Sequence, residues 1–154
     1  MLIVEVLPMN LLHAIEISAS GLAVQRARMD VIAENLANAS TTRAPGGGPY
    51  RRKRVIVAAG TAWQVPFALP DILNSRSSHQ GVRVLRIEDD MSTLPLVFDP
   101  GNPEAGPDGY VQMPNVNPVV ELVDMISATR AYEANAAVVS AIKEMAQTAL
   151  RIAR

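Results

Sequence analysis

The first pattern along the chain is a run of apolar positions at alternating steps of three and four residues in residues 10–38. Such spacing keeps one side of an α-helix apolar and is typical of coiled coils. We therefore predict a long first helix that ends at Asn38, a residue type that tolerates the left-handed conformation of a helix stop. Its seam consists of Leu12, Ile15, Ala19, Leu22, Arg26, Met29, Ala33 and Leu36, in which arginine is the one polar interruption.

The same period returns in the last third of the chain. Asn117 can cap a helix and Pro118 suits its first position, and no glycine or proline follows, so we predict a helix from there to Arg154. At about 1.5 Å per residue it would measure roughly 50 Å, and apolar stripes of that length drive association with partners. The seam consists of Leu122, Met125, Thr129, Tyr132, Ala136, Val139, Lys143, Ala146, Leu150 and Ala153.

Between the helices the pattern changes to short strands and turns. The segment 39–50 is a linker by content, and we expect its glycine triplet, residues 46–48, to act as a hinge. Alternating or β-branched residues predict strands at 51–59, 81–90, 96–98 and 109–113. Residues 60–80 predict an irregular excursion that covers the sheet with Trp63 and Phe67.

These elements predict an α+β protein with two long terminal helices in a coiled-coil-like antiparallel hairpin and a small central antiparallel β module. We expect residues 1–9 to be a disordered N-terminal extension, 10–42 and 114–154 to form the helical core, and 43–113 to form the linker and β module. Gly21, in the middle of the first helix, is expected to let another backbone approach closely. A self-contained two-helix hairpin packed on the sheet is an alternative that the pattern leaves open.

Composition excludes several classes of function. Aromatic residues make up 4% of the chain and hydrophobic residues 49%, which favours close helix packing over a thick core. The absence of cysteine excludes disulfides and thiolate catalysis. His13 and His79 have no second ligand at metal-binding spacing, and no catalytic motif is present. We expect no metal, no cofactor, no small-molecule substrate and no enzyme activity.

The basic run at residues 51–54 raises nucleic-acid binding as an alternative. It opens a predicted strand, where successive side chains point to opposite faces, and the net charge of −1 gives no general attraction to nucleic acid. A contact with acids such as Glu88, Asp89 and Asp90 is the preferred interpretation. A peripheral membrane helix is disfavoured because the last helix alternates acids and bases and is rich in alanine.

The N-terminal residues have too short an apolar run for a signal peptide and lack a basic region before it. Met9 directly precedes the predicted helix, so translation from Met1 and translation from Met9 both stay open.

Several motifs resemble those of the bacterial flagellar rod and hook axial proteins, and among them those of proximal rod subunits. They are SASGLAVQRARMDVIAENLANASTT at 18–42, TTRAPGGGPYRRKRV at 41–55, VFDPGNPEA at 97–105, DGYVQMPNVN at 108–117 and MISATRAYEAN at 125–135.

The resemblance implies a structural subunit of the basal-body proximal rod, whose terminal helices form the inner tube of a helical assembly. That assembly is the axial drive shaft that transmits torque from the motor to the hook and filament. It also implies export through the flagellar type III apparatus without a cleaved signal peptide, and a position in the rod across the periplasm. The implied partners are further copies of itself, other rod subunits, the inner-membrane ring, rod adaptor proteins and the export apparatus.

We expect assembly to rest on the apolar seams together with small and amide-bearing residues of the helices. Small residues permit close helix approach, and amides cap the backbone and bond across helices. We expect the candidate residues of the first helix to pack on those of the last helix, within and between subunits. The candidate assembly residues are Leu12, Ile15, Gly21, Leu22, Met29, Asn35, Leu36 and Asn38, and Leu122, Met125, Tyr132, Asn135, Ala136, Val139 and Leu150.

Overall fold

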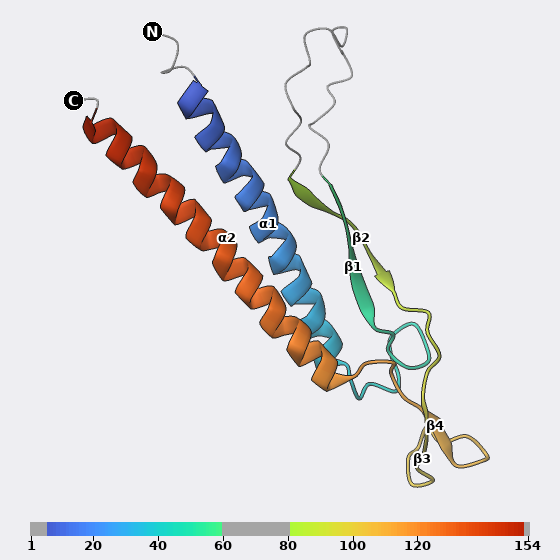
Figure 1. The fold of residues 1–154 in the computed structure, drawn as a ribbon. Helices are drawn as coiled ribbons and strands as arrows, with labels where there is room; N and C mark the ends of the chain where they lie inside the picture. The colour runs from blue at the N-terminus through green and yellow to red at the C-terminus, as the bar shows by residue number, and fades with distance from the viewer. Residues whose placement is uncertain (1–5, 60–80, 153–154) are drawn as a thin grey trace, which may run out of the picture. The chain divides into compact units, whose positions relative to one another are not determined.

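The computed structural model describes residues 6–59 and 81–152 (Figure 1), and within these it has the predicted order of helix, strands and helix. Trp63, Phe67 and the rest of the predicted excursion lie outside the described residues. The α+β class with long terminal helices is confirmed. The elements are α1 Val6–Ala37, β1 Lys53–Ala59, β2 Val82–Asp89, β3 Leu96–Phe98, β4 Tyr110–Gln112 and α2 Pro118–Ile152.

The chain divides into two compact units, and each contains a segment of both helices. Among the described residues, unit 1 comprises 6–26, 57–59, 81–85 and 130–152, and unit 2 comprises 27–56 and 86–129. Within unit 2, Asn35 of α1 contacts Glu121 of α2, and Met29 contacts Thr129. The contacts run in opposite directions along the two sequences, so the helix segments of unit 2 are antiparallel.

Helix α1 begins and ends differently from the prediction. It starts at Val6, before the expected Asn10, so residues 6–9 of the predicted N-terminal extension are helical. At its other end, no described residue other than glycine has a positive φ, and Asn38 is therefore not a left-handed stop. Instead the Asn38 side-chain amide donates to the Glu34 carbonyl at 2.9 Å. A side-chain cap satisfies a terminal carbonyl without any backbone strain.

Helix α2 starts as predicted. The Asn117 side-chain oxygen accepts from the backbone N–H of Val119 at 3.0 Å and of Val120 at 3.4 Å. Pro118 is the first helical residue, where its missing N–H costs nothing. The start of α2 is thus fixed by a side-chain N-cap.

The strands form two separate pairs, β1 with β2 and β3 with β4. In the second pair the antiparallel register places Leu96 opposite Gln112, Val97 opposite Val111 and Phe98 opposite Tyr110. The alternation at 81–90 gives the expected strand, but it does not give a buried face, because Val82, Leu85 and Ile87 are 39%, 52% and 51% exposed.

The glycine triplet forms a defined turn. Gly47 and Gly48 both have φ of 80°, which side-chain-bearing residues rarely adopt. The turn closes through bonds from the Ala44 N–H to the Gly48 carbonyl at 2.8 Å and from the Gly47 N–H to the Ala44 carbonyl at 2.9 Å. Backbone conformation therefore accounts for two of the glycines, and the hinge stays a prediction.

Gly21 lies at a close helix contact in unit 1, although its neighbour is not a backbone as predicted. A Cβ at this position would lie 3.1 Å from the side-chain amide of Asn135. That amide in turn donates to the Ala131 carbonyl at 2.9 Å. The small residue in α1 thus makes room for a polar side chain of α2.

Candidate functional site

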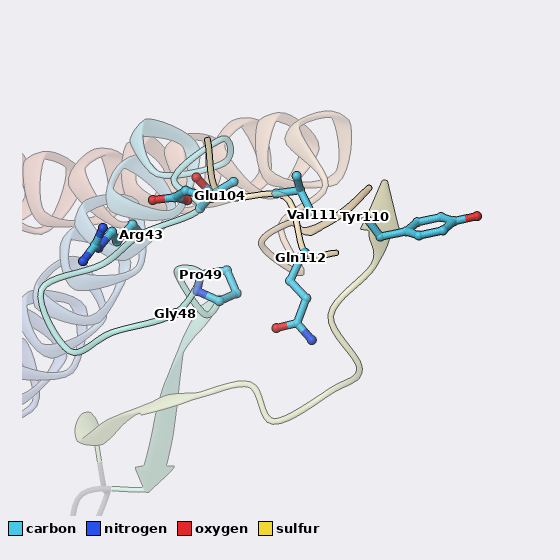
Figure 2. Close-up of a pocket in the computed structure, with 9 residues that line it drawn as sticks. Arg43, Gly48, Pro49, Glu104, Tyr110, Val111 and Gln112 are labelled. Atoms are coloured by element: carbon cyan, nitrogen blue, oxygen red, sulfur yellow. The ribbon is translucent and has the colours of Figure 1, made fainter. Parts of the chain in front are cut away.

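An open hollow of about 420 Å³ lies beside β4 in unit 2 (Figure 2). Its lining includes Arg43, Glu104 and Gln112 together with glycine and proline of the neighbouring turn. Its lining contains no histidine or cysteine, and no hydrogen bond between the described side chains of the lining pairs a nucleophile with a base. Among the described residues, no cluster of three or more histidine, cysteine or acidic side chains could hold a metal ion.

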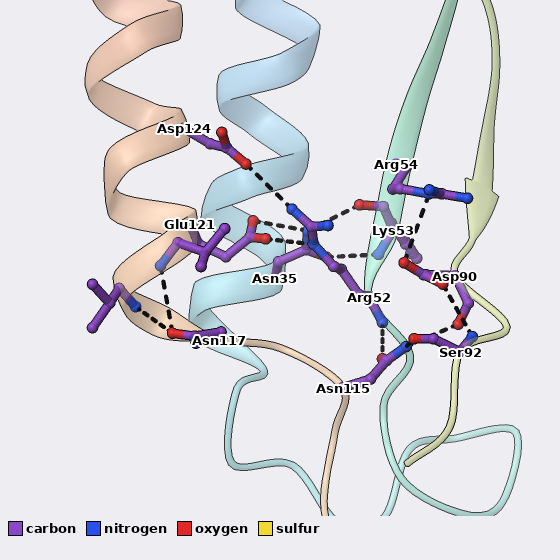
Figure 3. Close-up of polar contacts among 12 residues, drawn as sticks. Asn35, Arg52, Lys53, Arg54, Asp90, Ser92, Asn115, Asn117, Glu121 and Asp124 are labelled. Carbon is purple, nitrogen blue, oxygen red and sulfur yellow. Dashed lines mark hydrogen bonds and ion pairs between the residues drawn. The ribbon is translucent and has the colours of Figure 1, made fainter. Parts of the chain in front are cut away.

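The densest polar structure is a buried network in unit 2, centred on Asn35 of α1 (Figure 3). The Asn35 side chain is 1% exposed, and all of its hydrogen-bonding capacity is used. Its oxygen accepts from the Tyr50 hydroxyl at 3.0 Å and the Lys53 N–H at 2.8 Å. Its amide donates to the Lys53 carbonyl at 2.9 Å and to Glu121 Oε2 at 3.0 Å. One side chain thus joins α1, β1 and α2.

Glu121 is the charged member of this network. It is the first-turn acid of α2 and is fully buried, with an exposed fraction of 0%. Arg52 donates from Nε to Glu121 Oε1 at 2.6 Å and from Nη2 to Asp124 Oδ2 at 3.2 Å. A buried carboxylate is tolerated only when it is paired and hydrogen-bonded, and Glu121 has both an arginine and an amide donor.

Asn115 extends the network from Arg52 to the segment that follows β2. Its side-chain oxygen accepts from the Arg52 N–H at 2.8 Å, and its amide donates to the Asp90 carbonyl at 3.0 Å and to Ser92 Oγ at 2.8 Å. The Ser92 N–H donates to Asp90 Oδ1 and lowers the pKa of that carboxyl. We name the set Asn35, Tyr50, Arg52, Lys53, Asn115, Glu121 and Asp124 the buried network.

The basic run is largely neutralised inside the chain. Lys53 pairs with Glu34, and Arg54 lies 4.0 Å from Glu88 and 3.8 Å from Asp90. Arg52 pairs with the acids of α2 described above. Cations engaged in this way are poorly placed to bind phosphates, which removes the main argument for a nucleic-acid interface. Of the predicted acidic partners, Glu88 and Asp90 therefore have a partner within the same chain.

The pKa of Tyr50 gives a test of the network. Burial, with nearby Glu34, Asp89 and Glu121, raises this pKa to about 12. In the unfolded chain the phenol ionises from about pH 10, whereas in the folded chain it stays neutral up to about pH 12. The contribution of this hydroxyl to the free energy of unfolding is therefore complete below pH 10 and is lost as the pH rises toward 12. We expect the free energy of unfolding to fall by about 1.4 kcal/mol per pH unit in that window. Urea denaturation from pH 9 to 11.5 measures this slope.

In Tyr50→Phe that alkaline slope should disappear, while stability at neutral pH falls by about 1 kcal/mol because one hydrogen bond is lost. Tyr132→Phe, which removes a hydroxyl outside the buried network, serves as the control and should keep the slope. Equal slopes in the wild type and Tyr50→Phe would contradict the burial of this hydroxyl.

The predicted assembly residues fall into three groups by exposure. Gly21 and Asn35 are buried within the chain. Gly21 lies against the side chain of Asn135 of α2, and Asn35 donates to Glu121 of α2. Leu12, Leu122, Tyr132 and Leu150 are exposed, at 64%, 49%, 36% and 71%. The remainder are half-buried: Ile15, Leu22, Met29, Leu36, Asn38, Met125, Asn135, Ala136 and Val139.

Most of the buried positions of the two helices lie one residue before the predicted seam. One residue corresponds to a rotation of about 100° around a helix with 3.6 residues per turn. The predicted seams therefore point partly outward, and the inner line contains more polar residues than expected. The buried members of that inner line are Ser18, Gly21, Ile32 and Asn35 in α1, and Glu121, Ala128 and Ile142 in α2; Val24 and Val31 of α1 are buried outside it.

Sequence reasoning missed Tyr50, Arg52 and Glu121 as members of a common site. One signal was available, because Glu121 interrupts the apolar run PVVELVDM at the start of a helix. Its partner could not be identified, since Asn35 lies 86 residues away along the chain.

Comparison with known proteins places both ends of the chain in flagellar families. Residues 15–44 match the family described as flagella basal body rod protein, and residues 108–152 match the flagellar basal body rod FlgEFG protein C-terminal family. These ranges contain most of α1 and all of α2. Within the described residues, no helix is long and apolar enough to cross a membrane.

Full-length relatives extend this similarity to the middle of the chain. The flagellar basal-body rod protein FlgC of Borreliella burgdorferi is 49% identical over 151 residues, which cover 94% of this chain and 98% of the relative. FlgC of Bacillus subtilis is 44% identical over 95% of this chain and 100% of its own length. FlgC of Salmonella typhimurium is 39% identical over 89% of this chain and 93% of its own length.

Identity at this level over almost the whole length establishes the family, whose members are structural proteins rather than known enzymes. The location is accordingly the flagellar basal body, in assembly with other rod components. The chain therefore belongs to the FlgC family and is a structural subunit of the flagellar basal-body rod.

Proposed function

We propose that this subunit assembles through apolar stripes on the outward sides of its terminal helices, and that the buried network holds the helices and β1 together while load passes through them. The observation that carries the proposal is a stripe at the start of α2. Its members are spaced i, i+3, i+4 and i+7, as on one face of a helix. They are Val119, Leu122, Val123 and Ile126, with exposed fractions of 69%, 49%, 61% and 56%.

We name these four residues the α2 stripe. Complete burial of such a side chain stabilises by about 1.5 to 3 kcal/mol, and roughly half of that remains to be gained here. A contiguous exposed stripe of this kind is typical of a protein interface. The stripe includes Leu122 of the predicted assembly residues, which faces away from the buried network.

The outward side of α1 has smaller apolar side chains than the α2 stripe. Leu12 is 64% exposed, and it is followed by small exposed residues at Ala19, Ala23, Ala33 and Ala37. Small side chains let a neighbouring helix approach closely, so many weak van der Waals contacts can share the load. Large aliphatic residues on α2 and alanines on α1 are thus complementary in size.

We further propose the finer points that the resemblance implies. The subunit occupies the proximal rod within the periplasm and transmits torque from the motor to the hook and filament. It contacts further copies of itself, neighbouring rod subunits, the inner-membrane ring and rod adaptor proteins. It leaves the cytoplasm through the flagellar type III apparatus without a cleaved signal peptide, and it catalyses no reaction. The motifs at both ends of the chain support this set of proposals.

Amide hydrogen exchange tests the assembly mode. We expect residues 10–38 and 117–152 to exchange more slowly in purified basal bodies than in the purified monomer, because packing against neighbours suppresses local opening of the helices. The glycine turn at 44–48, which belongs to neither helix, provides an internal comparison. Full protection of both helices already in the monomer, without change on assembly, would contradict assembly through the helices and favour a self-contained bundle.

A further inference from the structure

The β3–β4 hairpin presents an apolar face that the chain itself does not cover. The register places Phe98 opposite Tyr110, and their rings meet edge to face with centroids 5.3 Å apart. Side chains alternate across a strand, so these rings lie opposite to Val111, which is 3% exposed. We name Leu96, Phe98 and Tyr110 the hairpin face; their exposed fractions are 60%, 62% and 49%.

The hairpin holds this face in a fixed form. Gly109 has φ of 76°, and a Cβ there would lie 2.8 Å from Cε2 of the Phe98 ring. Any side chain at residue 109 would thus displace the phenyl ring as well as strain the backbone. The Asp99 N–H donates to the Gly109 carbonyl at 3.0 Å and closes the hairpin beside the rings. Rigid exposed aromatic residues are typical anchors of protein interfaces.

The hairpin segment itself carries acidic charges only, and Arg43 of the linker lies near it at the hollow beside β4. Residues 91–117 contain Asp99, Glu104 and Asp108 and neither lysine nor arginine. Glu104 also lines the open hollow next to β4 (Figure 2). Opposite charges around apolar centres guide and orient association. The complementary surface is therefore an apolar strand or helix face with basic residues beside it.

Strand β2 of this chain has these properties. Leu85 and Ile87 are about half exposed, and Arg83 precedes them at the alternating position, so the three share one side of the strand. We name Arg83, Leu85 and Ile87 the β2 face. Arg86 lies on the opposite side of the strand and is paired with Glu88 at 2.8 Å, so Arg83 is the cation of this face.

We propose that the hairpin face of one copy docks on the β2 face of a second copy of this chain, with Asp108 of the first near Arg83 of the second. The inference rests on the proposed rod function. The contact joins two different surfaces, so it can repeat from copy to copy and form an open helical assembly, as a rod requires. The faces are small compared with a stable interface of about 800 Å² per partner, so the contact acts together with the helices.

Disulfide trapping tests the contact directly, because the chain has no cysteine of its own. Two variants, Asp108→Cys and Arg83→Cys, are produced in the same cells, and purified basal bodies are oxidised. We expect a dimer of this chain that disappears on reduction and is absent when either variant is produced alone. Asp108→Cys combined with Arg28→Cys, an exposed arginine of α1, is the matched control and should give no dimer.

Charge exchange provides a second measurement that does not need cysteines. Arg83→Glu should reduce the amount of this chain in basal bodies by up to about fivefold, as expected for the loss of an exposed ion pair worth about 1 kcal/mol. Asp108→Arg in the same chain should restore it. Failure of this restoration would overturn the proposed pairing even where the cysteine variants do not incorporate.

The outcomes separate this inference from the rod function. If both cysteine variants are present in basal bodies and no dimer forms, or if Asp108→Cys is trapped by a different subunit, the contact between copies is refuted while the rod function stands. If the unmodified chain is absent from purified basal bodies, the rod function itself fails.

Discussion

Glu121→Ala is expected to lower the free energy of unfolding by about 3 to 5 kcal/mol, a large share of the stability of a small protein. The variant removes the carboxylate that pairs with Arg52 at 2.6 Å and accepts from Asn35 at 3.0 Å. Arg52 and the Asn35 amide would each lose a buried acceptor, and an unpaired buried group costs its full desolvation. Urea denaturation followed by circular dichroism measures the change.

Asp124→Asn is the matched control. Asp124 accepts from the same arginine at 3.2 Å, but its side chain is 40% exposed, so its loss should cost no more than about 1 kcal/mol. Equal effects of Glu121→Ala and Asp124→Asn would refute the view that burial makes Glu121 the centre of the network.

The network also explains why the strand beside the helices begins where it does. The oxygen and the amide of Asn35 pair with the N–H and the carbonyl of Lys53, the first residue of β1. The side chain therefore takes the place of a neighbouring strand at that position and satisfies an edge that would otherwise be open. Residues of the linker and of both helices meet here, so loss of Glu121 should loosen all three.

The helices could be predicted from the sequence because their signals are local. Steps of three and four residues, the Asn117 cap and Pro118 act within a few positions, and the observed bounds of α2 match them closely. The strands at Leu96–Phe98 and Tyr110–Gln112 were likewise marked by short apolar runs between turn residues. Local signals of this kind need no knowledge of the tertiary fold.

The orientation of the helices could not be predicted in the same way. The seam with the most apolar residues was taken as the inner one, whereas the buried positions include Ser18, Asn35 and Glu121 beside apolar residues such as Ile32 and Ile142. These polar residues are tolerated inside because distant partners satisfy them, and such partners are invisible in a local pattern. In a subunit that assembles, some apolar side chains are available to neighbours instead of the subunit's own core. The most apolar line of each helix therefore differs from its buried line, and the predicted seam was displaced by one position.

If the α2 stripe is the assembly surface proposed above, assembly should be more sensitive than folding to a single change there. Leu122→Glu is expected to leave the monomer folded, because the side chain is already 49% exposed and contributes little to the core. In the assembled rod the same position would bury an unpaired carboxylate, at a cost of about 3 kcal/mol or more per copy. That cost corresponds to more than a hundredfold weaker association, and motility should be lost.

Ser127→Glu places the same charge on an exposed position of α2 outside the α2 stripe, and it should preserve swimming. Circular dichroism of both purified variants checks that the monomers are folded, and immunoblots of basal bodies measure incorporation. Since both variants carry one additional acid on one helix, a difference between them reports the position of the charge and not its presence. Normal motility of Leu122→Glu would mean that the α2 stripe stays in contact with water in the rod, and assembly would then have to use another surface of the subunit.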